Sequence, residues 1–197
     1  MAVEPKSPVK APDDARRRRL LEVSLGVFSR FGYRKASMEE VARAADVSRQ
    51  GLYLHFATKE ALFRAAVEYA LGSQLEAALA ALAEAGRPLE ARLVAALDEW
   101  LGRHVGHLGA AASDLTETRG TLKAEHEARF EKAVARALTD SPLMAVYASA
   151  GLTAPQLART LHATARGWKH TCTSRETFIE HITVAVRMLF APLRRAR

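Results

Sequence analysis

Apolar residues recur three or four positions apart along almost the whole of this 197-residue chain. In the first such segment Leu21, Leu25 and Phe28 stand at positions i, i+4 and i+7, which lie on one face of an α-helix. No segment shows the alternation of apolar and polar residues that marks a half-buried strand, and no internal repeat is present. Because 49% of the residues are apolar, the helices have enough apolar surface to enclose a core. The sequence therefore predicts an all-α fold.

Glycine, proline and helix-capping residues divide this pattern into segments. Residues 1–13 contain three prolines and two lysines, and we expect them to form a flexible basic arm. Gly32 is predicted to end the first helix, and Pro192 is predicted to end the last. The predicted helices cover about 14–31, 38–45, 49–56, 59–82, 89–101 and 154–172, and a short and a longer helix are predicted within 113–139. The last predicted helix begins with a capping box, Thr173 to Glu176, and ends near Ala191.

Cysteine content and the lack of long apolar runs limit where such a chain can work. Its one cysteine, Cys172, rules out an internal disulfide framework and a cysteine-based zinc site. No apolar run reaches the roughly 18–20 residues that span a bilayer, and the first residues lack the apolar core of a secretory signal. We therefore expect a cytoplasmic protein without a membrane segment.

The sequence contains no motif that would carry catalysis. P-loop, GxGxxG, GxSxG and HExxH patterns are all absent, so an enzyme is not expected. His104 and His107 have a spacing that could share a metal ion, but no carboxylate motif or second cysteine accompanies them. We therefore expect neither a metal nor a cofactor.

Positive charge is concentrated at the start of the chain. The net charge is +7, and residues 1–60 carry +4 of it in under a third of the length. A basic N-terminal part indicates a polyanionic partner. Lys6 and Lys10, together with Arg16 to Arg19, are expected to strengthen DNA binding chiefly by counterion release.

Two short predicted helices joined by a tight turn follow this basic segment, and together they form a helix-turn-helix unit. The turn requires a residue that tolerates positive φ, and Asp46 stands there. In the second helix Leu52 and Phe56 share the inner face, while Arg49, Gln50 and Tyr53 lie on the other side. Arginine and glutamine near the start of such a helix are side chains that read base edges in the major groove.

This unit and the residues around it contain the pattern Ala36-Ser37-Met38-Glu39-Glu40-Val41-Ala42, Ala45, Val47-Ser48, Leu52-Tyr53, His55-Phe56, Lys59-Glu60 and Leu62. The pattern resembles the DNA-binding domain of the TetR/AcrR family of transcriptional regulators. It implies a helix-turn-helix DNA-binding domain over 14–74, with the motif itself at 37–56. It also implies an all-α ligand-binding and dimerisation domain over 75–197.

The resemblance further implies roles for individual residues. Ser37 and Ser48 stand where the family places helix caps and phosphate contacts. The base-reading positions are Arg49, Gln50 and Gly51, and the positions that contact the DNA backbone are Tyr53, His55 and Lys59. Asp46 is a departure, because the family usually has glycine there. Aspartate visits the left-handed region more readily than most residues, so we expect the turn to form at a modest cost in stability.

The function implied is that of a homodimeric repressor, which leaves its double-stranded DNA operator when a small-molecule effector binds. Activation stays open, because it depends on where the operator lies, and the effector and operator sequence stay open as well. The alternative is a nonspecific architectural DNA-binding protein. That alternative accounts for the basic arm but not for a C-terminal domain of more than 100 residues.

Candidate effector and dimer contacts lie in the C-terminal part. Trp100 and His104 are expected one turn apart on one helix, and Arg119, Arg166 and Trp168 complete the predicted ligand site. The two arginines can instead pair with glutamates or face solvent. The last helix is predicted to have two apolar faces, the second of which would form a four-helix dimer interface with the helix at about 154–172. These faces comprise Phe178, Ile182, Ala185 and Leu189 on one side and Ile179, Val186 and Phe190 on the other.

Overall fold

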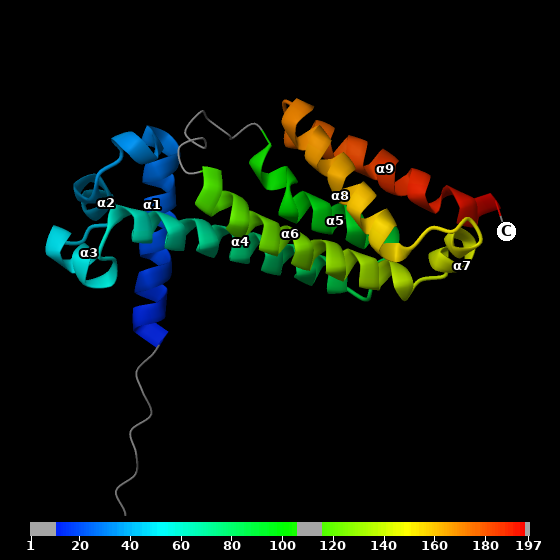
Figure 1. Cartoon of the computed structure of the whole chain (residues 1–197), viewed down its shortest axis with the longest axis horizontal. Helices are drawn as coiled ribbons and strands as arrows, with labels where there is room; N and C mark the ends of the chain where they lie inside the picture. Colours follow the sequence, from blue (N-terminus) through cyan, green and yellow to red (C-terminus); the bar gives the residue numbers. More distant parts are fainter. Residues whose placement is uncertain (1–10, 106–115, 196–197) are drawn as a thin grey trace, which may run out of the picture. The chain divides into compact units, whose positions relative to one another are not determined.

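The structure is a computed structural model that describes residues 11–105 and 116–195 (Figure 1). Over these two ranges the chain consists of helices and connecting turns, without a strand, which confirms the predicted all-α fold. None of the helices in them is long and apolar enough to cross a membrane. The helices are α1 (Ala11–Lys35), α2 (Met38–Ala44), α3 (Arg49–His55), α4 (Lys59–Ala83), α5 (Leu89–Trp100), the 3-10 helix η1 (Gly102–His104), α6 (Thr116–Thr139), α7 (Leu143–Ala148), α8 (Ala154–Thr171) and α9 (Arg175–Arg195).

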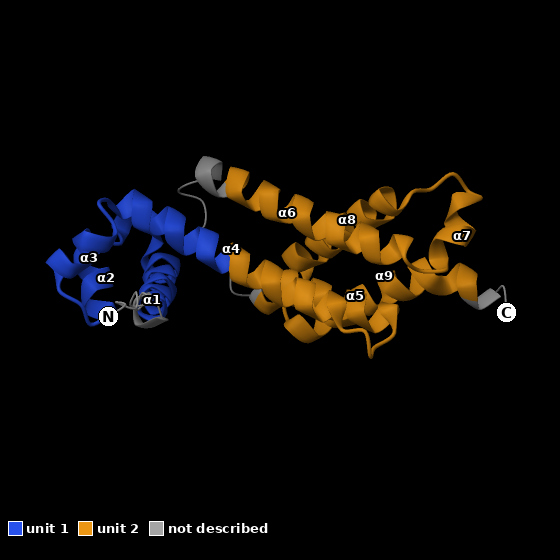
Figure 2. Cartoon of the chain, turned by 90° about the horizontal axis from the view of Figure 1, so that it is seen from below, with its two compact units in different colours: residues 1–70, 109–119 blue, residues 71–108, 120–197 orange. Residues whose placement is uncertain are grey.

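The described residues divide into two compact units, and the division falls within α4 (Figure 2). The first unit contains residues 11–70 and 116–119, and the second contains 71–105 and 120–195. The sequence-based boundary between residues 74 and 75 lies on this same helix. Each unit encloses a hydrophobic core of its own.

The core of the N-terminal unit is built by α1 to α4 around leucine and phenylalanine side chains. Phe28 of α1 meets the ring of Phe63 of α4 edge to face, with ring centroids 5.1 Å apart. Val41 of α2 and Leu52 of α3 are fully buried beside them. The apolar face predicted for each short helix is therefore the face that packs, and it holds α2 and α3 against α1 and α4.

The core of the C-terminal unit contains a buried chain of polar groups. The indole Nε1–H of Trp100 on α5 donates to Nε2 of His162 on α8 at 3.2 Å. His162 Nδ1 lies 2.8 Å from Oε1 of Glu131 on α6. Since Nε2 accepts, Nδ1 carries the proton and donates to the carboxylate. Phe130 stacks on Trp100, with ring centroids 5.6 Å apart, so this chain links three helices inside an otherwise apolar core.

The N-terminal boundary of α1 differs from the prediction. The helix begins at Ala11, inside the expected arm of residues 1–13, and Pro12 stands in its first turn, where a missing amide hydrogen costs nothing. Lys6 and Lys10 lie outside the described residues. Gly32 does interrupt the helix, with φ 78° and ψ 156°, but a further turn continues to Lys35. Only glycine enters this backbone conformation readily.

Several predictions for the C-terminal unit need correction. Residues 116–139 form a single helix, and the apolar segment after Ser141 contains the short helix α7. Ser174, not Thr173, caps α9, because its Oγ accepts from the amide of Thr177 at 3.2 Å. The last helix also continues through Pro192 to Arg195, since a proline so close to a helix end removes a single hydrogen bond.

The two apolar faces predicted for the last helix are in fact one. Phe178, Ile182, Val186 and Phe190 are spaced four residues apart and are all buried in the core. Ile179, Ala185 and Leu189 are partly buried and pack against it. The large apolar residues that α9 leaves exposed are Val184 and Met188, with 53% and 70% of their surfaces accessible.

Removing His162 should destabilise the C-terminal unit. In His162→Ala the buried indole N–H of Trp100 loses its acceptor and a cavity opens, so we expect the free energy of unfolding to fall by roughly 2–4 kcal/mol. Arg166→Ala, on the exposed side of α8, is the control and should change it by less than about 0.5 kcal/mol. Urea denaturation followed by circular dichroism measures both. Equal stability of the two variants would contradict the structural role of the polar chain.

Candidate nucleic-acid interface

The first helix of the predicted helix-turn-helix motif, α2, begins with the capping box expected from the sequence. Ser37 Oγ accepts from the amide of Glu40 at 3.1 Å, and Glu40 Oε2 accepts from the amide of Ser37 at 2.8 Å. The Ser37 hydroxyl also donates to Glu40 Oε2, at 2.9 Å, and the two hydrogen bonds that this carboxylate accepts from Ser37 lower the pKa of Glu40. The cap therefore fixes the start of α2 and leaves Ser37 exposed at the surface of the unit.

The turn between α2 and α3 contains the left-handed residue that the sequence predicts. Asp46 has φ 55° and is the one residue other than glycine with positive φ among the described residues. The amide of Val47 then reaches back to the carbonyl oxygen of Ala42 at 3.0 Å. This backbone geometry reverses the chain and directs it into α3.

The second helix, α3, has seven residues and is held by a cap and by two buried side chains. Ser48 Oγ accepts from the amide of Gly51 at 2.9 Å, which confirms Ser48 as the N-cap. Leu52 and Phe56 are buried in the core. A Cβ atom on Gly51 would stand 3.0 Å from Ser48 Oγ, so a larger residue there would crowd the cap.

The opposite side of α3 presents the side chains that the sequence assigned to DNA. Arg49, Gln50, Tyr53 and His55 are exposed, and the guanidinium of Arg49 stands over the ring of Tyr53, 5.8 Å from its centroid. Leu54 is exposed as well, and sequence reasoning did not single it out. Its position in the helix could have indicated it, because it follows Gln50 by one turn.

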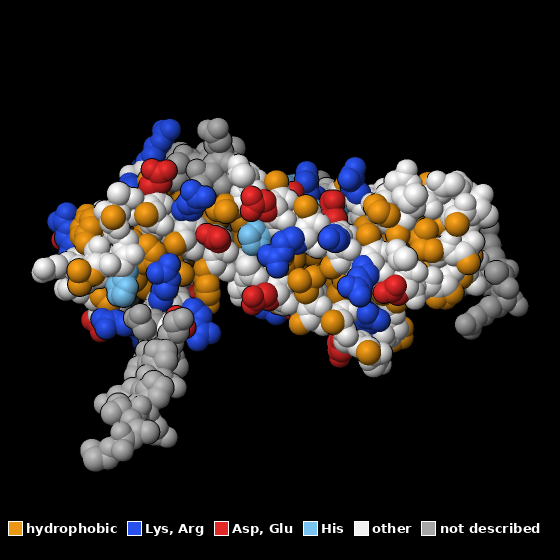
Figure 3. Space-filling view, turned by 60° about the horizontal axis from the view of Figure 1, so that its bottom comes forward, with side chains coloured by type: hydrophobic (Ala, Val, Ile, Leu, Met, Phe, Trp, Pro, Cys, Tyr) orange, Lys and Arg blue, Asp and Glu red, His pale blue; other side chains and the backbone are white. Residues whose placement is uncertain are grey.

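Arginines of α1 lie next to this recognition surface. Arg16, Arg17 and Arg19 line a hollow of about 320 Å³, with Gly51, Leu54 and His55 of α3 on its other wall. The guanidinium of Arg17 also stands over the Phe56 ring, 5.1 Å from its centroid. Figure 3 shows Lys and Arg side chains around apolar ones on this unit. A surface of this charge attracts phosphate groups.

Lys59 has a structural contact that the sequence did not reveal. Its Nζ donates to the carbonyl oxygens of Tyr33 at 3.0 Å and Ala36 at 3.1 Å, and it lies 3.4 Å from that of Arg34. It also stands 4.5 Å from the centroid of the Tyr33 ring. A cation at the end of a helix satisfies carbonyl groups that lack intrahelical partners. Lys59 thus joins the start of α4 to the end of α1, and its contact with the DNA backbone stays a prediction.

The residues predicted to bind a ligand do not gather around one cavity. Trp100 is buried in the core, whereas Arg166 is half exposed and lies 3.4 Å from Glu127, which matches the alternative of pairing with a glutamate. Trp168 stacks on His181, with ring centroids 3.9 Å apart. The side chains of His104 and Arg119 are outside the described part of the structure.

The expectation that Trp100 and His104 share a helix is wrong. Helix α5 ends at Trp100, and the chain tightens into η1 from Gly102. The chain packs closely at Gly102, where a Cβ atom would stand 2.9 Å from the ring of Phe178 and would also collide with Asp98. His107 lies outside the described residues, and no group of three potential metal ligands occurs within them.

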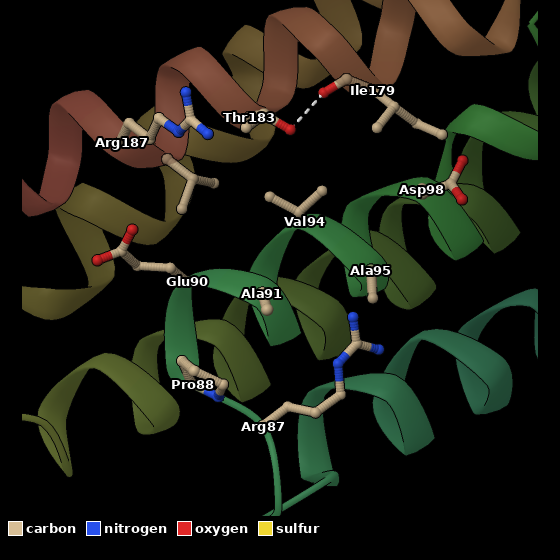
Figure 4. A pocket seen from close by; sticks show the side chains of 11 residues that line it. Arg87, Pro88, Glu90, Ala91, Val94, Ala95, Asp98, Ile179, Thr183 and Arg187 are labelled. Atoms are coloured by element: carbon tan, nitrogen blue, oxygen red, sulfur yellow. Dashed lines mark hydrogen bonds between the residues drawn. The ribbon is translucent and has the colours of Figure 1, made fainter.

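A groove between α5 and α9 forms a hollow in the C-terminal unit (Figure 4). Its volume is about 690 Å³, within the range of small-molecule sites. Apolar side chains form much of its wall, and Arg87, Glu90, Asp98, Thr183 and Arg187 add polar groups. Asp98 is already held by Arg175 at 2.6 Å, and Thr183 donates to the carbonyl oxygen of Ile179 at 2.7 Å. Arg187 is exposed, and it lies across the groove from α5.

A capped recognition helix, a tight turn before it and arginines beside it define a helix-turn-helix DNA-binding protein. Residues 20–66 match the family model described as bacterial regulatory proteins, tetR family. Over these residues the chain resembles the DNA-binding domain of the TetR family of bacterial regulators.

Curated relatives match a limited part of the chain. An uncharacterised HTH-type transcriptional regulator of Bacillus subtilis, YerO, is 32% identical over 60 residues, which are 30% of this chain and 21% of that protein. The A-factor receptor protein of Streptomyces griseus is 37% identical over 51 residues, which are 26% of this chain and 18% of the receptor. The matched segments are thus under a quarter of the length of these two relatives.

Solved structures extend the likeness to the fold of nearly the whole chain. The crystal structure of a putative TetR-family regulator from Mesorhizobium loti superposes with a TM-score of 0.70, covering 92% of this chain and 98% of that one. Its sequence identity is 20%, so the likeness concerns the fold.

Proposed function

We propose that the protein is a sequence-specific transcriptional regulator, namely a homodimeric repressor that a small-molecule effector releases from its operator. The observation that carries DNA recognition is the exposed side of α3, where Arg49 and Gln50 follow the cap directly. Both side chains can form bidentate hydrogen bonds, arginine with guanine and glutamine with adenine. In a dimer two such helices would enter successive major grooves roughly 34–36 Å apart.

Selection of binding sites from random duplexes tests sequence-specific recognition. We expect wild-type protein to enrich a sequence with two related halves, while a nonspecific architectural protein would bind all duplexes equally. Arg49→Ala and Gln50→Ala should each relax the preference at one base pair, at a cost of about 1–3 kcal/mol. Arg64→Ala, which removes an exposed charge on α4, is the matched control and should retain the preference.

The variant Lys59→Ala distinguishes a contact with the DNA backbone from a contact with a base in the same assay. Lys59→Ala should weaken binding to all sequences similarly, and a lost phosphate contact would flatten the salt dependence by about one unit. Because the Lys59 amine also holds carbonyl groups at the end of α1, its loss should lower the melting temperature. A changed sequence preference in Lys59→Ala, with none in Arg49→Ala, would reverse these assignments.

The proposed dimer uses the outer faces of α8 and α9. Thr160, Ala163 and Gly167 are exposed small residues on α8, and they allow another helix to approach closely. On α9 the exposed Val184 and Met188 stand opposite the face that packs in the core. The stack of Trp168 on His181 ties the two helices to each other. Exposed apolar residues on a terminal helix favour burial against a second copy of the same surface.

Charging the outer face of α9 should separate the subunits. The double variant Val184→Asp/Met188→Asp would place four carboxylates at a symmetric interface, so we expect a monomer at micromolar concentration with its helical content intact. Leu152→Asp is the control, since Leu152 is exposed before α8 and outside this face. Sedimentation velocity measures the change. A wild-type monomer, or a double variant that stays dimeric, would exclude this interface.

The groove between α5 and α9 supports effector binding better than the residues that the sequence suggested. Its apolar wall includes Val94 and Ile179, and Arg187 supplies an exposed positive charge at its edge. These features fit a small molecule with an apolar body and an anionic or carbonyl group. The effector acts by its differential affinity for two conformers of the protein. A molecule releases the protein from the operator only if it binds more tightly to the conformer that cannot bind the operator.

Two variants distinguish this groove from the sequence-based ligand site. A panel of small carboxylic acids is screened for release of the operator by fluorescence anisotropy. For any acid that acts, Arg187→Ala should weaken release about tenfold or more and Val94→Trp should block it, with operator affinity unchanged. Arg166→Ala should behave like wild type. The opposite pattern, with release lost in Arg166→Ala and normal in Arg187→Ala, would favour the sequence-based site.

A further inference from the structure

Leu54 is the most exposed large apolar side chain in the described part of the chain. Its exposed fraction is 83%, and it is the last residue but one of α3, whose inner side is fully packed. Single exposed leucines are common on protein surfaces, so exposure by itself indicates nothing. The position of this leucine on the helix is the informative feature.

Gln50 and Leu54 lie on the side of α3 directly opposite the core. At 100° per residue, Leu52 and Phe56 point inward within about 40° of each other, and the direction opposite to them coincides with Leu54, with Gln50 about 40° away. Arg49 and Tyr53 lie to one side, in contact with each other. If Gln50 enters a major groove, Leu54 enters it too, one turn further along the helix.

The surroundings of Leu54 identify nucleic acid as the partner. Leu54 forms one edge of the hollow that Arg16, Arg17 and Arg19 line. Three arginines line this hollow against one carboxylate, that of Asp46. An apolar protein surface would leave the excess positive charge unmatched, whereas a duplex supplies phosphates on both sides of the groove. The charge around Leu54 thus fits a duplex that receives the leucine between its two backbones.

We propose that Leu54 reads the C5-methyl group of a thymine in the major groove. That methyl group is the apolar feature that base edges present there, and it distinguishes thymine from cytosine. One helical turn is about 5.4 Å and successive base pairs are about 3.4 Å apart, so Leu54 contacts a base pair next to or one beyond the pair read by Gln50. This inference rests on the proposed operator binding and adds one thymine to each half of the operator.

Replacing thymine by deoxyuridine tests this contact, because uracil keeps the Watson–Crick hydrogen bonds and lacks the methyl group. The duplex is the one selected by wild-type protein, with its thymines replaced one position at a time in both halves. We expect one position where wild type loses about fourfold in affinity per half, as for one buried methyl group. Leu54→Ala should bind the thymine duplex about tenfold more weakly per half and be indifferent to the replacement.

Control variants separate the leucine from its neighbours. Leu54→Met keeps an apolar side chain of similar volume and should keep the sensitivity to uracil, and Gln50→Ala should keep it as well. Because Leu54 is exposed, the melting temperature of Leu54→Ala should equal that of wild type. The methyl contact is overturned if wild type binds every uracil-containing duplex as tightly as the thymine duplex, or if the affinity of Leu54→Ala still falls on replacement. In both cases sequence-specific binding stands. Failure to select any preferred duplex overturns both.

Discussion

The N-terminal unit depends on the burial of Leu52, because a helix of seven residues does not persist in water by itself. Leu52 is completely buried, and with Phe56 it anchors α3 in a core supplied by α1, α2 and α4. The cap from Ser48 satisfies an amide at the free end of α3. Packing thereby decides which side chains are left for DNA, since every residue of α3 that does not face the core is presented outward.

The features that the sequence predicted well are local ones. Caps at Ser37 and Ser48 bind amides three residues away, and the left-handed turn concerns the backbone of Asp46 itself. The spacing of Leu52 and Phe56 defines the inner side of α3 within five residues. Because the signal and its structural outcome share one short segment, such features can be read without knowledge of the tertiary fold.

The features that the sequence did not predict are contacts between residues that are distant in the chain. The amine of Lys59 binds carbonyl groups of Tyr33 and Ala36, and the indole of Trp100 meets His162 across the core. Helical periodicity shows that such side chains face inward or outward, but it does not reveal their partners. The same limit explains Arg166, whose pairing with Glu127 depends on how α6 and α8 pack. The close packing at Gly102, where only glycine fits, likewise involves Phe178 on another helix.

The division of the chain into two units also places both of its tryptophans in one unit. Both tryptophans, Trp100 and Trp168, belong to the C-terminal unit, while Tyr33, Tyr53 and Tyr69 belong to the N-terminal unit. Excitation at wavelengths that only tryptophan absorbs therefore gives an optical signal from the C-terminal unit, without any introduced label. Trp100 beside His162 and Trp168 beside His181 sense different surroundings. Native emission can thus follow the C-terminal unit while a separate probe on DNA follows the N-terminal one.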